Sequence, residues 1–213
     1  MKKNIMILFT IILIIFVFSL NSAAESNYNW EQLIKNTKIQ LETNKSDIVL
    51  NYTLAVAYAN TGEITKCYNI IDVFGSSVSR KDFNTAVSPY LADWQDYKNM
   101  NNLLLLNYAA FKKIINKDYK NAISMFKYIA QIDPDNIWTL NHIAAALVEI
   151  KEYEQAIKYA NQALSKQGNE YSHLIKGYVY YEQGNYVKTI FEAARARNLV
   201  KELADDEYQN FLE

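Results

Sequence analysis

One unit of this chain recurs at a spacing of 34 residues, and the repetition restricts the fold more than any single motif does. Asp118–Ile123 recurs as Glu152–Ile157, 34 positions later. A third copy, Gly184–Ile190, has its tyrosine a further 33 positions on. In each copy an aromatic residue stands three positions before a small residue, a spacing typical of a helix–turn–helix unit. Such a unit cannot bury its apolar face alone, so neighbouring units must stack and present a continuous surface.

The repeats resemble the tetratricopeptide repeat family. Its pattern has Leu-Gly and Tyr on the first helix, Ala and Phe on the second, and Pro at the end. The resemblance covers roughly residues 28–74 and 100–197. Lys176 departs from the pattern, because it stands where Leu is usual. The matching positions are Tyr58, Gly62, Cys67 and Ile71, then Tyr119, Ala122, Phe126 and Pro134, then Leu140, Ala144, Tyr153 and Ala156, and finally Gly177, Tyr180, Gly184 and Tyr186.

Small residues and turn residues give the pattern its physical basis. Where two helices of a hairpin cross closely, a side chain larger than Ala, Gly, Cys or Thr would force them apart. Gly62 and Gly184 lie at turns between helices, where a left-handed backbone favours a residue without Cβ. Asp133–Asn136 contains a proline that cannot continue a helix and an asparagine suited to start the next one.

The resemblance implies an all-α fold: a right-handed superhelical stack of helix–turn–helix repeats with an irregular helical insertion and a C-terminal capping helix. With 5 Gly and 2 Pro in 213 residues, little of the chain suits loops or β-turns. The expected organisation is a leader at 1–24, a half repeat and a degenerate repeat at 25–74, an insertion at 75–100, repeats at 101–134, 137–168 and 170–197, and a cap at 198–213.

The N-terminus has the pattern of an export signal. Lys2 and Lys3 precede an apolar run, Ile5–Leu20, which is followed by the small residues Ser22–Ala24. These features predict cleavage near Ala24 and export to the periplasm, cell envelope or exterior. The alternative is that Ile5–Leu20 is retained and anchors the chain in a membrane. Membrane contact is expected only in that case.

Charge and motifs exclude several functional classes. The formal net charge is −1 and no basic stripe is visible, so nucleic acid is not an expected partner. Nucleophile, phosphate-loop and dinucleotide motifs are absent, which predicts a protein that is not an enzyme and has no cofactor. His142 and His173 lack further ligands at metal-site spacing, so we expect surface or groove histidines and no metal. The single cysteine, Cys67, is expected in the core.

The best candidate for a functional site is the groove that first helices line in the tetratricopeptide repeat family. Its aromatic side chains would anchor an extended or helical peptide, so we expect a protein or peptide partner and a scaffold or adaptor function. Some of these residues could instead pack within the stack. The sequence does not specify an oligomeric state. The candidate groove residues are Tyr52, Trp138, Asn141, Glu149, Tyr171, Leu174, Tyr178, Tyr181 and Glu182.

A second hypothesis places the function in a cavity. A tyrosine-lined cavity inside the stack, covered by the insertion at 75–100, would suit a carrier or sensor of a small molecule. A bound small ligand would distinguish this hypothesis from the adaptor hypothesis.

Overall fold

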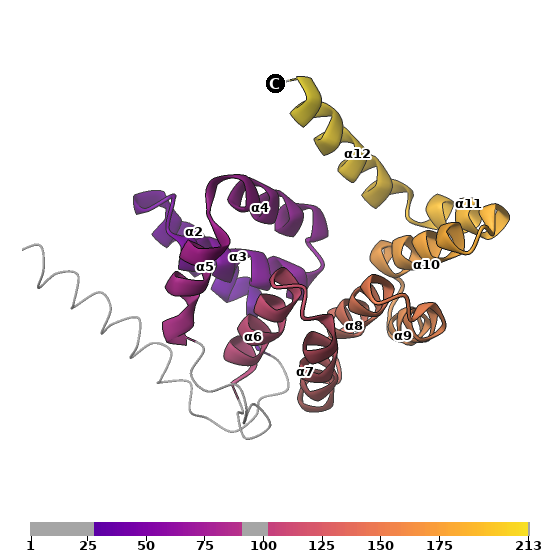
Figure 1. Ribbon diagram of the computed structural model, residues 1–213, viewed down its shortest axis with the longest axis horizontal. Coiled ribbons are helices and arrows are strands. Elements are labelled where there is room, and N and C mark those ends of the chain that lie inside the picture. The colour runs from indigo at the N-terminus through magenta and orange to yellow at the C-terminus, as the bar shows by residue number, and fades with distance from the viewer. Residues whose placement is uncertain (1–27, 91–101, 213) are drawn as a thin grey trace, which may run out of the picture.

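The computed structural model describes residues 28–90 and 102–212, and within this part of the chain every regular element is a helix (Figure 1). The predicted all-α class is therefore confirmed. The elements are α2 (Trp30–Thr43), α3 (Ile48–Thr61), α4 (Ile64–Ser77), α5 (Arg80–Val87), the 3₁₀ turn η1 (Ser88–Tyr90), α6 (Leu103–Ile115), α7 (Tyr119–Ile132), α8 (Ile137–Glu149), α9 (Tyr153–Lys166), α10 (Glu170–Glu182), α11 (Tyr186–Arg195) and α12 (Arg197–Leu212).

Asparagine and aspartate side chains start most of these helices. The Oδ1 atom of Asp47 accepts a hydrogen bond from the amide of Leu50 at 2.9 Å, and so caps α3. Asn136 caps α8 in the same way, since its Oδ1 accepts from the amide of Trp138 at 3.1 Å. Such caps satisfy amides that have no partner inside the helix. The stop and restart predicted at 133–136 are confirmed, because α7 ends at Ile132.

The turns between paired helices share one left-handed backbone position. Gly62 has φ +83° and Gly184 has φ +71°, which confirms the predicted role of both glycines. The equivalent positions in the two central hairpins are Lys117 (φ 60°) and Lys151 (φ 62°). These lysines adopt a conformation that costs an L-residue roughly 1–2 kcal/mol.

Consecutive helices pack against one another from α2 to α4 and from α6 to α11. The small residues lie at the crossings as expected: Ala122, Ala144 and Ala156 are completely buried. Lys176 replaces the usual leucine without leaving an isolated buried charge. Its Nζ lies 2.9 Å from Oε1 of the buried Glu192 on α11.

The insertion interrupts this regular packing. α5 packs against α3, and the 3₁₀ turn η1 follows it directly. The remainder of the expected insertion, from residue 91, lies outside the described residues. α6 begins afresh at Leu103, with Asn102 as its cap. α3 packs against α4, α5 and α6, whereas α4 and α6 do not pack closely against each other in the described residues.

The predicted C-terminal helix forms, but it covers α10 more than α11. α12 packs on α10 and contacts α4, where the Thr65 hydroxyl donates to Oε2 of Glu202 at 2.8 Å. Val187, Ile190 and Phe191 on α11 consequently stay exposed. None of the helices in 28–90 and 102–212 combines the length and the hydrophobicity needed to cross a bilayer.

Candidate functional site

The structure places the nine predicted groove residues in two environments. Tyr52 belongs to the core: its ring packs edge-on against Phe83 at 5.1 Å between centroids, and its hydroxyl donates to the carbonyl of Tyr108. Burial raises the pKa of Tyr52 well above its ordinary value. The Tyr52 ring thus joins α3 to the insertion helix α5 and to α6.

Asn141 is also fully buried, between α8 and α10. Its Nδ2 donates to Oδ1 of Asn169 at 3.1 Å, and its Oδ1 accepts from the Ser172 hydroxyl at 2.5 Å. The same Asn169 oxygen caps α10 by accepting from the amide of Ser172 at 2.8 Å. Asn141 therefore fixes the start of one repeat against the preceding one, because a buried amide needs all its partners.

Trp138 and Tyr171 contact the N-terminal repeat. The half-buried indole of Trp138 lies against the turn at Gly62, where an added Cβ would be 2.0 Å from its Cζ2 atom. Tyr171 is buried in a cluster with Ile64 on α4. Burial raises the pKa of Tyr171 well above its ordinary value, and interaction with Tyr68 on α4 raises it further. These contacts connect α4 to α8 and α10.

The remaining members lie nearer the surface. Tyr178 and Tyr181 on α10 are 51% and 56% exposed, which leaves their rings available to a partner. Glu149 and Glu182 are exposed as well, and Leu174 is half-buried. The two carboxylates form no ion pair with any described residue, although ion pairs occur elsewhere on the chain.

Two tyrosines outside the predicted set extend this exposed group. The Tyr153 hydroxyl donates to Oε2 of Glu182 at 3.2 Å. The Tyr186 ring lies 6.0 Å from that of Tyr181, in an edge-to-face arrangement. Both open second helices at the repeat spacing, which marked them as packing residues. Tyr153 is half-buried and does pack against the core, whereas Tyr186 is exposed, and the periodicity gave no sign of that exposure. We call Glu149, Tyr153, Tyr178, Tyr181, Glu182 and Tyr186 together the tyrosine–glutamate surface.

The carboxylates of this surface lie close enough to two of its tyrosines to affect their pKa values. The negative charge of Glu182 raises the pKa of Tyr178, and Glu149 contributes in the same direction. Desolvation and then Glu182 raise the pKa of Tyr153. A phenol beside two carboxylates stays neutral and presents its ring as a weakly negative face. The surface can therefore hold a cation by both charge and ring contact.

The two histidines lie in places that the sequence did not indicate. The prediction of a surface or groove position was wrong for His142, which is buried between the rings of Phe111 (4.9 Å) and Phe126 (5.3 Å). Burial lowers the pKa of His142 to about 3. His173 is half-buried, with its Nδ1 2.6 Å from Oε2 of Glu192. Burial raises the pKa of Glu192, but hydrogen bonds from Lys176 and His173 outweigh it and leave that pKa below its usual value.

Two further features bear on chemistry in the described residues: clusters of metal-ligand residue types and the cysteine thiol. In 28–90 and 102–212 no cluster of three or more His, Cys, Asp or Glu side chains could hold a metal ion. The thiol of Cys67 is buried in the core, and burial raises its pKa to about 12. This confirms the predicted packing position of Cys67, where a thiolate is strongly disfavoured.

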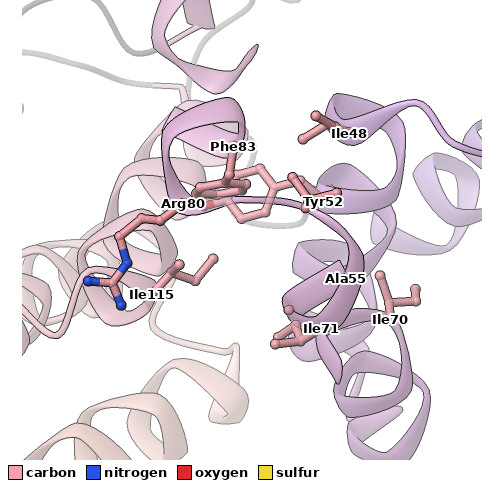
Figure 2. A pocket seen from close by; sticks show the side chains of 10 residues that line it. Ile48, Tyr52, Ala55, Ile70, Ile71, Arg80, Phe83 and Ile115 are labelled. Carbon is pink, nitrogen blue, oxygen red and sulfur yellow. The ribbon is translucent and has the colours of Figure 1, made fainter. Parts of the chain in front are cut away.

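A cavity of about 330 Å³ opens between α3, α4, α5 and α6. Figure 2 shows Arg80 and Ile115 on one side of it, with Ile70, Ile71 and Ala55 on the other. Val78, Arg80 and Phe83 from the expected insertion supply part of its lining. Sequence periodicity could not reveal it, since the insertion breaks the period.

Comparison with known proteins supports the repeat assignment. A family model described as tetratricopeptide repeat matches residues 113–176, and these residues are a tetratricopeptide repeat segment as the motifs predicted. No curated protein matched the sequence. The tetratricopeptide repeat fold supports a role as a protein-interaction scaffold.

Several solved structures of MamA are similar to this chain at low identity. A crystal structure of MamA has 12% identity and TM-score 0.44, covering 83% of this chain and 92% of that chain. MamA 41-end from Desulfovibrio magneticus RS-1 has 13% identity and TM-score 0.43, covering 81% and 86%. MamA MSR-1 has 15% identity and TM-score 0.44, covering 81% and 95%.

Proposed function

We propose that this chain is a non-catalytic scaffold, exported to the cell envelope, that binds a cationic segment of a protein partner on its tyrosine–glutamate surface. One observation carries the proposal: Tyr178 and Tyr181 are more than half exposed beside two carboxylates that no described cation neutralises. Exposed tyrosines in a cluster are frequent anchors of protein interfaces. Lysine or arginine side chains of a partner would meet both the carboxylates and the ring faces.

The other predicted groove residues support the surface from within. Asn141 and Tyr171 hold α8 and α10 in place through buried contacts, and Trp138 fixes α8 against the first repeat. Their rigidity reduces the conformational entropy lost on binding, since the surface is already arranged. We therefore assign direct contact with the partner to the exposed members and a positioning role to the buried ones.

Two defined peptides test the chemistry of this surface. A lysine-rich peptide should bind with an affinity that falls steeply as salt increases, and a glutamate-rich peptide of equal length should not bind. The Tyr178→Ala/Tyr181→Ala variant should lose at least about five-fold in affinity. Glu149→Gln/Glu182→Gln should lose affinity and also most of the salt dependence.

A matched variant controls for charge alone. Glu31→Gln/Glu42→Gln removes two exposed carboxylates from α2, outside the tyrosine–glutamate surface, and should leave the affinity unchanged. If this control loses as much affinity as the Glu149/Glu182 variant, only the net charge matters and the proposed site is wrong.

Export is supported by Lys2, Lys3, the apolar run Ile5–Leu20 and the small residues up to Ala24. N-terminal sequencing of the protein from its own host tests this step. A chain that begins at Glu25 is expected. A chain that begins at Met1 and resists alkaline extraction from membranes would show that Ile5–Leu20 is an anchor.

A further inference from the structure

The cavity beside the insertion is independent of the tyrosine–glutamate surface and has a different chemistry. Its volume of about 330 Å³ falls in the range of small-molecule sites. Its walls come from α3, α4, α5 and α6 and are mainly apolar. The wall residues other than Arg80 are Ile48, Tyr52, Ala55, Ile70, Ile71, Gly75, Val78, Phe83 and Ile115.

Apart from Arg80, the side chains that line the cavity are apolar, except for the hydroxyl of Tyr52, which already has a hydrogen-bond partner. The hydroxyl of Tyr52 donates to the carbonyl of Tyr108, so Tyr52 offers its ring to the cavity. Phe83 packs edge-on against that ring, and both lie at the same end of the cavity in Figure 2. The aliphatic side chains of α4 and α6 form the remaining surface, which suits an apolar chain.

Among the described residues that line the cavity, Arg80 is the one with a charge. It is exposed, and its side chain runs from the start of α5 past Ile115, so the guanidinium lies at the open edge of the cavity (Figure 2). It forms no ion pair with a described residue, and none of the described lining residues has a carboxylate. The nearby carboxylate Asp82 accepts a hydrogen bond from the Ser79 hydroxyl at 2.7 Å. The cavity therefore combines apolar walls with one available guanidinium, which is complementary to an anionic head group.

We propose that this cavity binds a small amphipathic carboxylate, such as a medium-chain fatty acid. The carboxylate pairs with Arg80, and the hydrocarbon chain lies among the isoleucines and Phe83. This ligand class deepens the cavity hypothesis drawn from the sequence and needs no partner on the tyrosine–glutamate surface.

Methyl spectra of isoleucine-labelled protein, in the form that its host produces, test the site directly. Decanoate should shift the methyl signals of Ile48, Ile70, Ile71 and Ile115 saturably and leave those of the exposed Ile39 and Ile190 unchanged. Equal shifts at Ile39 and Ile190 would mean non-specific adsorption and would overturn the proposal. No saturable shift at the four wall residues would do the same.

The charge is tested with two variants and two further probes. Arg80→Gln should weaken decanoate binding by about ten-fold, since a hydrogen bond to a charged group is lost. Lys81→Gln removes the same charge from the next residue, which does not line the cavity, and should leave the affinity unchanged. Decanol and decyltrimethylammonium should bind wild type more weakly than decanoate does. Equal binding of all three probes, or equal effects of the two variants, would refute the carboxylate assignment.

Filling the cavity gives an independent check. Ile71 is partly exposed at the mouth, so Ile71→Trp should fold normally and block decanoate. Unchanged decanoate affinity in a folded Ile71→Trp protein would place the binding site elsewhere. Loss of peptide binding on the tyrosine–glutamate surface would not affect this result, so the two proposals fail separately.

Discussion

Substituting Gly62 tests the contact that holds the α3–α4 turn against α8. Gly62 combines a left-handed backbone with direct contact to the Trp138 indole. Gly184 has a similar φ, but nothing lies within 4 Å of an added Cβ there. Gly184→Ala therefore measures only the free-energy cost of placing alanine in a left-handed backbone conformation. Gly62→Ala measures that cost plus the cost of overpacking against Trp138.

The magnitudes follow from these two terms. The left-handed conformation costs alanine roughly 1–2 kcal/mol, partly offset by the lower entropy of the unfolded chain. Gly184→Ala should thus destabilise by about 1 kcal/mol. Overpacking adds roughly 1–3 kcal/mol, so Gly62→Ala should cost about 2–4 kcal/mol.

Chemical denaturation followed by circular dichroism gives both values. Adding Trp138→Ala to Gly62→Ala should recover the overpacking term, so a double-mutant cycle should show a coupling of about 1 kcal/mol or more. Equal costs for the two glycine substitutions, or no coupling between Gly62 and Trp138, would refute the assigned contact.

Three further predictions concern single residues. Burial lowers the pKa of His142 from 6.5 to about 3, so between these pH values the unfolded chain binds more protons than the folded chain does. The free energy of unfolding should therefore fall as pH decreases through that range, by roughly 1.4 kcal/mol per pH unit. The His142→Leu variant, unfolded at the same pH values, should lack this contribution. Lys151→Gly should raise the unfolding free energy by about 0.5–1 kcal/mol, because glycine relieves the left-handed turn. Lys176→Met should destabilise by about 2 kcal/mol in the same assay, since it removes one charged hydrogen-bond partner of the buried Glu192 carboxylate and leaves His173 and Arg195 beside it. Removing the exposed ion pair of Lys66 should change little.

Local features of the fold could be predicted because they depend on neighbouring residues. The cap at Asn136 and the left-handed glycines at 62 and 184 follow from short-range chemistry. The left-handed lysine at 151 could not be recognised by residue type. It could be found only by aligning the repeats on Gly184.

Contacts between distant repeats limited the site prediction. Trp138, Asn141 and Tyr171 occupy the expected helix positions, but α4 approaches α8 and α10 and partly covers that face. The hydrogen bond between Thr65 and Glu202 joins residues 137 positions apart, and no repeat motif encodes it. Lys176 shows the same limitation: the departure from the pattern was visible in the sequence, but its compensation by Glu192 was not.

The sequence could not locate the cavity, and the reason differs from that for the groove residues. Its walls depend on how α5 packs against α3, and the insertion has no counterpart in the repeat pattern. The sequence indicated only that a break in the period at 75–100 could cover a cavity. Two wall residues were named from the sequence, Tyr52 as a groove residue and Ile71 as a match to the repeat pattern, but neither as part of a cavity.

Photo-cross-linking in the native host tests the central proposal most directly. A benzoylphenylalanine at position 181 should cross-link to a discrete protein partner, and Glu149→Gln/Glu182→Gln in the same chain should abolish the product. The same probe at the exposed position 39 on α2 should not give that product. A product that forms equally from both positions, or that persists without the two carboxylates, would contradict a partner site on the tyrosine–glutamate surface.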